Sequence, residues 1–147
     1  MLLHSLAHIE FNAMKSYLDT ALRFSHTIEN IQDRCEFLCD MLEVSSQESD
    51  HFQLLLQRLG KDGVNYGDIP VHSALVDNVK RSMDHLDKRI AVISIIQEGK
   101  GVDAGERLMI KLQSFQDKQG GIILKKILDE EVDHIRVGYK WFKKICE

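Results

Sequence analysis

One short pattern occurs twice in this chain, as Glu48-Ser-Asp-His51 and again as Glu131-Val-Asp-His134. Both copies read Glu-x-x-His, and both lie within long stretches whose apolar residues recur at helical spacing. Side chains three positions apart on a helix project to the same side, about one turn apart. Each copy therefore places a carboxylate beside an imidazole, where the pair can bind one metal ion or, through the glutamate, bridge two.

A separate helical stretch precedes each copy and carries a lone glutamate on its apolar face. Glu10 precedes the first copy, and Glu98 precedes the second. Four helices that project four glutamates and two histidines inward can hold two metal ions in the core of a bundle. The sequence thus predicts six metal ligands: Glu10, Glu48, His51, Glu98, Glu131 and His134.

Apolar spacing predicts four main helices, at residues 2–25, 28–59, about 86–98 and about 119–145, with short helices at 74–83 and 106–116. Asp84 is a candidate cap for the third main helix, and the alternative is one continuous helix over 74–98. Three glycines just after Glu98 are expected to interrupt the helical pattern: Gly99, Gly101 and Gly105.

The two halves of the chain repeat one plan. A hairpin over 2–59 carries the first glutamate and the first Glu-x-x-His, and a hairpin over 86–146 carries the second set. A glycine-rich crossover over 60–85 joins them. We therefore expect a single all-α domain over 1–147, a ferritin-like four-helix bundle built from two helical hairpins and one long connection.

The inner face of the second helix is expected to carry the first Glu-x-x-His together with these residues: Ile31, Cys35, Leu38, Leu42, Ser45, Phe52, Leu55 and Leu59. Cys35 and Cys39 are one turn apart, and we interpret them as small buried apolar residues rather than as metal ligands. With Cys146 they make an odd number, which favours a reducing, cytoplasmic location.

Charge and burial both favour a metal centre. Four glutamates contribute four negative charges, which two divalent ions would balance, and carboxylate with imidazole suits iron or manganese. One unpaired buried carboxylate costs several kcal/mol, so four would exceed the ~5–15 kcal/mol stability of a typical domain. The predicted stripes contain no lysine or arginine that could neutralise these groups. The alternative is that the stripes are rotated and the glutamates are exposed.

Residues beside the ligands are candidates for orienting them. Gln47 and Glu130 immediately precede the two pattern glutamates, and either could orient a histidine across the bundle; the alternative is that both are surface polar residues. Tyr17 is interpreted as a core tyrosine with a bonded hydroxyl, and the alternative is a redox-active neighbour. The other histidines are expected to lie away from the cluster, His8 on nearly the opposite side of its helix and the rest on the surface or in loops: His4, His26, His72 and His85.

The composition is that of a globular protein, with 44% hydrophobic and 29% charged residues. No apolar run approaches the ~20 residues of a membrane span. A net charge of −4 counts against nucleic-acid binding. Basic residues gather on the last helix, where we expect a solvated outer face, and the alternative is a docking patch for an acidic partner: Lys125, Lys126, Arg136, Lys140, Lys143 and Lys144.

Several stretches resemble the domain-of-unknown-function 455 family of ferritin-like proteins. They are Ala7-His-Ile-Glu10, Tyr66-Gly-Asp-Ile-Pro70-Val-His72, Glu98-Gly-Lys-Gly-Val-Asp103, and Asp129-Glu-Glu-Val-Asp-His-Ile135 with Gly138-Tyr-Lys-Trp-Phe142. The resemblance covers essentially the whole chain and implies a helical bundle with a di-iron type centre on the same six residues. Members usually carry additional N-terminal sequence, which this chain is expected to lack. The family brings no settled activity.

Three functions are consistent with such a centre. The first is an O2-dependent oxidase or oxygenase that contains two iron ions, or manganese, and acts on a small organic substrate. A tRNA-modifying hydroxylase is a variant of it, against which the acidic pI counts. The second is iron handling, by ferroxidase activity or storage. The third is a non-enzymatic interaction module that the metal stabilises. If the chain forms an oligomer, we expect a dimer.

Overall fold

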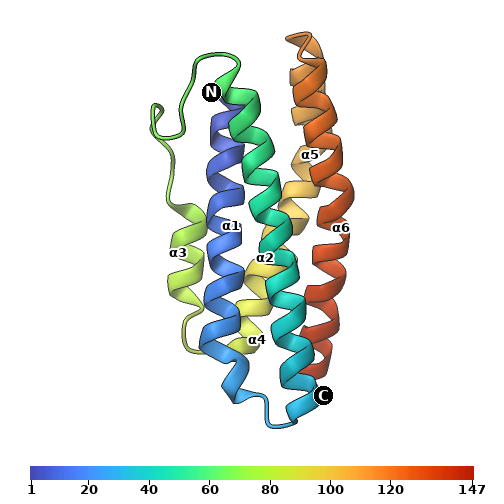
Figure 1. Ribbon diagram of the computed structural model, residues 1–147. Coiled ribbons are helices and arrows are strands. Elements are labelled where there is room, and N and C mark those ends of the chain that lie inside the picture. The colour runs from blue at the N-terminus through green and yellow to red at the C-terminus, as the bar shows by residue number, and fades with distance from the viewer.

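The computed structural model describes residues 1–147, which form helices joined by turns and loops, with no strand. The elements are α1 (Leu2–Phe24), η1 (Ser25–Thr27), α2 (Ile31–Gly60), α3 (Ala74–Arg81), α4 (Leu86–Arg89), η2 (Ile90–Gln97), α5 (Glu98–Ser114) and α6 (Lys118–Cys146). Figure 1 shows α1 beside α2 and α5 beside α6, with the crossover and α3 on the outer side of α1. The predicted all-α fold of two hairpins and one long connection is confirmed.

The third long helix differs from its prediction. α4, the π-helical segment η2 and α5 follow one another without a break from Leu86 to Ser114, so the expected interruption after Glu98 is wrong. Helical glycine costs about 0.5–1 kcal/mol relative to alanine, and packing can outweigh that cost. At Gly105 an added Cβ would lie 2.5 Å from Leu128 of α6, so this glycine allows the two helices to approach closely.

The short helix expected at 74–83 is present as α3, and it is separate from the helix that follows. The single helix over 74–98 is therefore excluded. His85 rather than Asp84 occupies the N-cap position of α4, and no side-chain cap bond forms there.

The first half of α2 is rotated relative to its prediction. Ile31, Cys35, Cys39 and Leu42 are exposed, and the buried face instead contains Phe37, Met41, Val44, Ser45, Glu48, His51, Leu55 and Leu59. Both stripes have helical spacing, but the observed one places larger side chains inside. Phe37 packs edge-on against Trp141 of α6, with ring centroids 5.0 Å apart. The interpretation of Cys35 and Cys39 as buried residues is therefore wrong.

Two apolar clusters make up the core. One contains Leu3, Ala7, Leu55, Leu59, Leu112, Ile123, Leu124 and Ile127, and the other contains Tyr17, Ala21, Phe37, Met41, Val44, Ile90, Ile93 and Trp141. Along each long helix, the predicted ligands lie between residues of the first cluster and residues of the second. A buried polar band therefore separates the two halves of the core.

The crossover is attached to α1 by histidines. His4 was expected at the surface, but it is fully buried. The crossover covers it, and the backbone N–H of Gly67 donates a hydrogen bond to its Nε2 at 3.0 Å. Its ring also stacks on Tyr66, whose hydroxyl lies 2.7 Å from Nδ1 of His8. The crossover thus buries a side chain that the α1 pattern alone would leave exposed.

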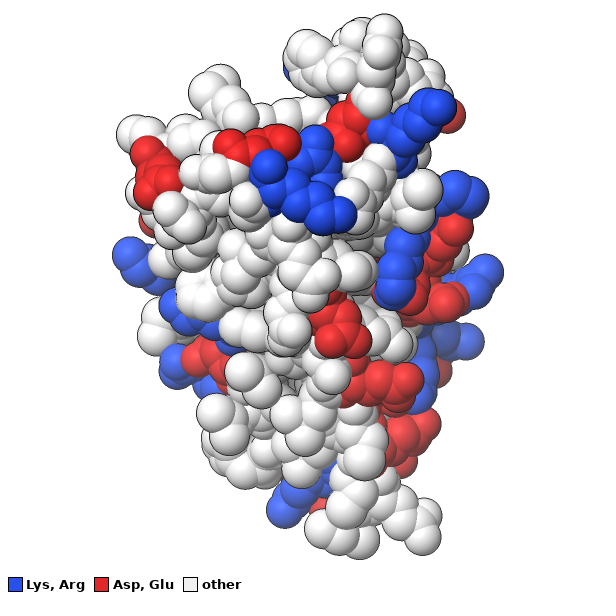
Figure 2. Space-filling view, turned by 45° about the horizontal axis from the view of Figure 1, so that its top comes forward, with Lys and Arg blue, Asp and Glu red and all other residues white.

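Charged side chains of both signs are interleaved on the surface in view in Figure 2. The six basic residues of α6 between positions 125 and 144 each pair with a carboxylate; Lys140, for example, contacts Glu36 and Asp40 of α2 at 2.7 and 2.6 Å. These residues therefore contribute to a mixed-charge outer face. No helix combines the length and the apolar composition needed to cross a bilayer.

Candidate metal centre

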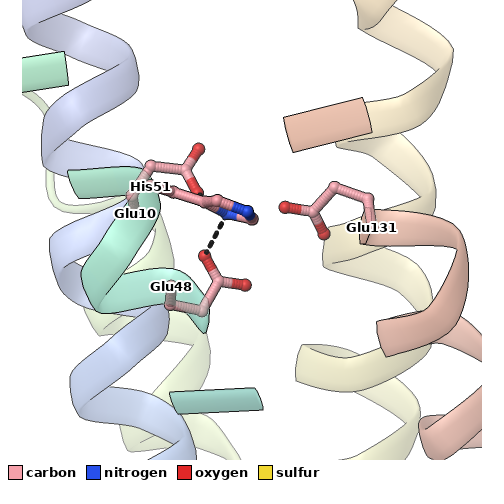
Figure 3. A group of neighbouring side chains, drawn as sticks. All are labelled: Glu10, Glu48, His51 and Glu131. Carbon is pink, nitrogen blue, oxygen red and sulfur yellow. Dashed lines mark ion pairs between the residues drawn. The ribbon is translucent and has the colours of Figure 1, made fainter. Parts of the chain in front are cut away.

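All six residues that the sequence nominates meet in the buried polar band. Glu10 comes from α1, Glu48 and His51 from α2, Glu98 from the start of α5, and Glu131 and His134 from α6. Each is at most 6% exposed, so the alternative of rotated stripes with solvated glutamates is excluded. Figure 3 shows the carboxylates of Glu10, Glu48 and Glu131 directed toward His51 from both sides of the bundle.

The first group of potential ligands consists of Glu10, Glu48, His51 and Glu131, whose ligand atoms all lie within 4.8 Å of one another. Nδ1 of His51 lies 3.3 Å from Glu10 Oε2 and 3.5 Å from Glu48 Oε2. These contacts lack hydrogen-bond alignment, since Nδ1 has no hydrogen-bond partner. The four groups surround one point instead of pairing with each other.

The second group repeats this arrangement with Glu48, Glu98, Glu131 and His134. Nδ1 of His134 lies 3.0 Å from Glu48 Oε1 and 3.3 Å from Glu131 Oε2. Glu48 thus faces one histidine with each of its oxygens, and both Glu48 and Glu131 belong to both groups. The two groups therefore share the pattern glutamates Glu48 and Glu131, whereas Glu10 belongs to the first group alone and Glu98 to the second alone.

Unpartnered polar atoms are concentrated at this place. Six buried side-chain atoms in the protein lack a hydrogen-bond partner, and five of them belong to the two groups: both oxygens of Glu48, Oε2 of Glu131, and Nδ1 of His51 and of His134. A buried polar atom without a partner costs about 1–3 kcal/mol. Carboxylate oxygens and imidazole nitrogens are suitable donors for divalent transition metals. The residues therefore fit metal binding, and these buried groups could hold metal ions.

Three carboxyl groups of the centre, those of Glu10, Glu48 and Glu98, have pKa values shifted from their usual ones. Burial raises the pKa of Glu10 well above its usual value, and the charge of Glu48 raises it further. Burial, followed by repulsion from Glu131, raises the pKa of Glu98 in the same way. Burial also acts to raise the pKa of Glu48, but its contacts with His134 and His51 outweigh that effect and hold the pKa at about 2.

The histidines shift in the opposite direction to that expected from burial. Desolvation acts to lower the pKa of His51, yet Glu10 and Glu48 raise it to about 11. His134 has a pKa of about 9, because Glu131 and Glu48 outweigh desolvation there. At neutral pH both imidazoles are therefore protonated, and a metal ion that bound to them would have to displace those protons.

Both candidate orienting residues contact a histidine on a neighbouring helix. Oε2 of Glu130 lies 2.6 Å from Nε2 of His51, and Oε1 of Gln47 lies 2.8 Å from Nε2 of His134. Each acceptor fixes a proton on Nε2 and leaves Nδ1 to face the carboxylates. Tyr17 also behaves as expected of a core tyrosine with a bonded hydroxyl, donating to Glu98 Oε1 at 2.8 Å.

A pocket beside the centre was not anticipated from the sequence. It has a volume of about 280 Å³, and nine of its sixteen lining residues are hydrophobic. Glu10, Glu98 and Glu131 contribute to its lining, so it reaches the predicted ligands. Its walls combine residues of α1, α3, α5 and α6, and an assembly of that kind leaves no local pattern in the sequence.

A family model described as "Protein of unknown function (DUF455)" matches residues 1–147, the whole chain. The chain belongs to the DUF455 family. An uncharacterized protein of Haemophilus influenzae is 34% identical to it over 146 residues, which cover 99% of this chain and 51% of that protein. The chain therefore spans about half the length of this relative. No solved structure matches the chain significantly.

Membership in DUF455 agrees with the resemblance noted in the sequence and brings no activity with it. Any functional conclusion therefore depends on the centre itself. The ligand role of the six residues stays a prediction, which their shared burial and orientation support.

Proposed function

We propose that this chain is a di-iron carboxylate oxidoreductase that uses O2 to oxidise a small organic molecule, with manganese as the alternative metal. One observation carries the proposal beyond metal binding. Three of the predicted ligands, Glu10, Glu98 and Glu131, line a largely apolar pocket of about 280 Å³. A centre that only stabilised the bundle would not need access to such a pocket, whereas a substrate does.

The chemistry of the ligand set supports iron. Carboxylates and imidazoles bind iron and manganese, and four carboxylates with two neutral histidines would balance two divalent ions. Iron bound there would supply electrons for the reduction of O2. The protein would bind and orient the reactants and exclude water.

The residues around the ligands support these roles. Glu130 and Gln47 each accept a hydrogen bond from a histidine and hold its ring in one orientation. The hydroxyl of Tyr17 donates to one oxygen of Glu98 and leaves the other oxygen without that bond. Apolar residues on both sides of the centre keep bulk water away, which strengthens electrostatic interactions within it.

The experiment is a metal and oxygen titration of the purified protein. Anaerobic protein is titrated with Fe(II), its metal content and melting temperature are measured, and O2 is then added. We expect about two Fe(II) ions per chain, a higher melting temperature, and an oxidation of iron that stops once the bound ions have reacted. No retained metal together with an unchanged melting temperature would contradict the proposal. Continued oxidation of many irons per chain into mineral would favour storage instead.

A matched pair of double variants completes the test. Glu48→Ala with Glu131→Ala removes both residues placed to bridge and should abolish Fe(II) binding. The control combines Glu43→Ala with Asp133→Ala, which changes exposed acidic residues on the same two helices. Equal loss of metal in both double variants would show that the buried glutamates have no special role.

A further inference from the structure

The pocket beside the centre has an aliphatic wall and polar residues at its two ends. All nine of its hydrophobic residues are aliphatic, and they include Ile9 and Ala13 of α1, Ala104 of α5 and Leu124 of α6. Apart from Gly101, the other lining residues are polar, and none of them carries a sulfur atom or a hydroxyl group. An aliphatic wall offers no hydrogen bond to a polar group, and burying such a group without a partner costs about 1–3 kcal/mol. The part of a ligand that fills this space must therefore be apolar.

The polar residues of the pocket fall into two sets. Glu10, Glu98 and Glu131 are buried at the metal end, whereas Lys100 and His72 are exposed and Gln97 is half-buried. The Lys100 ammonium forms no ion pair in the protein, unlike the six basic residues of α6 between positions 125 and 144. The side chains of Gln97 and His72 also line this pocket. A cation without a partner thus lies at the open end of an apolar pocket whose inner end is acidic.

We propose that this pocket binds a small aliphatic molecule with one anionic group, its apolar part inside and its anion beside Lys100 at the mouth. The substrate role of that molecule rests on the proposed function; its binding does not. Lys100 attracts the anionic group to the mouth, where that group also stays in contact with solvent. The apolar part of the molecule is then the part that reaches the metal end.

The size of the pocket limits the ligand to a small molecule. Its volume of about 280 Å³ lies at the lower end of the ~300–1,000 Å³ typical of ligand pockets. A short chain fits this range, and a folded macromolecule does not. We therefore choose octanoate as the probe, with octanol and octylammonium as matched probes of neutral and positive charge.

The test is the affinity of these three probes for the metal-free and the Fe(II)-loaded protein, measured by calorimetry. An exposed ion pair contributes about 0.2–1 kcal/mol, so octanoate should bind about 1.4- to fivefold more tightly than octanol. Octylammonium should bind more weakly than either. Lys100→Glu should invert the order of octanoate and octylammonium, whereas Lys111→Glu, an exposed change on the same helix away from the pocket, should preserve it. No binding of octanoate, or an order unaffected by Lys100→Glu, would overturn the proposal.

A second pair of variants tests the location. Gly101 lines the pocket, and a Cβ built on it meets open space, so Gly101→Phe should fill the pocket and reduce the affinity for octanoate at least tenfold. Gly99→Phe is the control, because Gly99 also has open space around its Cβ and does not line the pocket. Equal affinities in the two variants would contradict the location. If Gly101→Phe fails to fold, the comparison of probe affinities between Lys100→Glu and Lys111→Glu decides whether the ligand lies in this pocket.

The two proposals fail separately. Fe(II) binding and O2 consumption without octanoate binding would overturn the pocket assignment and leave the oxidoreductase proposal standing. Octanoate binding in a protein that retains no metal would overturn the oxidoreductase proposal and leave the pocket assignment standing.

Discussion

Glu130 of α6 and His51 of α2 face each other across the interface between the two hairpins, with 2.6 Å between Oε2 and Nε2. Lys126 contacts the other oxygen of Glu130, so this carboxylate is held on both sides. The corresponding partner of His134 is the neutral amide of Gln47. The two histidines are thus oriented by groups of different charge, and the two halves of the candidate centre are not equivalent.

Glu130→Gln should weaken metal binding at the His51 position by about 10- to 100-fold, the usual effect of removing a residue that orients a ligand. The amide keeps the shape of the side chain but loses the charge that raises the basicity of the ring. Competition against a chromophoric chelator measures the affinity. Asp129→Asn serves as the control, since Asp129 is the exposed neighbour on the same helix and pairs only with Lys125. The prediction is wrong if both variants bind Fe(II) as the unaltered protein does.

Metal binding should release protons and strengthen as pH rises. His51 and His134, with pKa values of about 11 and 9 in the metal-free protein, both lose a proton when Nδ1 binds metal. At pH 7 we therefore expect uptake of base on adding Fe(II) anaerobically, measured with a pH-stat. Calorimetry in buffers of different ionisation enthalpy provides an independent count. Loading without proton release would show that the imidazoles do not bind metal through these nitrogens.

The same shifts set the pH dependence of the metal-free fold. Both histidines have folded-state pKa values above the 6.5 of an unfolded chain, so their contribution to stability is complete below about pH 6.5 and is lost as pH rises through 9 and 11. We expect the free energy of unfolding to fall between pH 7 and pH 10 in urea titrations. Metal-loaded protein should show a smaller decline, because metal replaces the protons. A metal-free stability that rises over this range would contradict the assignment.

Gly138→Ala should destabilise the protein by about 1–3 kcal/mol, the usual cost of overpacking. An added Cβ would lie 2.6 Å from the backbone oxygen of Ser94 in η2, where no flexible side chain can yield. Because Ser94 is one turn before Glu98, metal affinity should fall as well. Urea denaturation measures the first effect. Gly121→Ala on the same helix is the control, since its nearest contact is an ordinary 3.6 Å to Met109 Sδ. Equal stability of the two variants would contradict this account.

The site was more predictable than the packing around it. The six candidate ligands can be recognised in the sequence for two reasons. Helical periodicity alone places the two side chains of a Glu-x-x-His together, and a buried carboxylate needs a partner wherever it lies. Helical periodicity also allowed Gln47 and Glu130, which directly precede the pattern glutamates, to be predicted as residues that orient the histidines. The first turns of α2 offered two stripes of similar spacing, and only contact with Trp141 selects the one that contains Phe37.

Features that depend on distant segments left no local signal. His4 is buried by a crossover residue 63 positions away. Glu98 was expected at a helix end because three glycines follow it, yet the helix continues along α6, where Gly105 permits the approach to Leu128. The π-helical segment η2 packs against Gly138, which lies on another helix. In each case a tertiary contact outweighs the local preference of the backbone.

The polar band that divides the core has a consequence for the lifetime of the protein. Without metal, the two apolar clusters meet across buried polar groups, which weakens the link between them. Metal bound in that layer, as we propose, would join all four long helices. Proteases act on chains that open locally, so if the centre binds iron as proposed, we expect the protein to be degraded more slowly when iron is plentiful, and its abundance then reports the metal status of the cell.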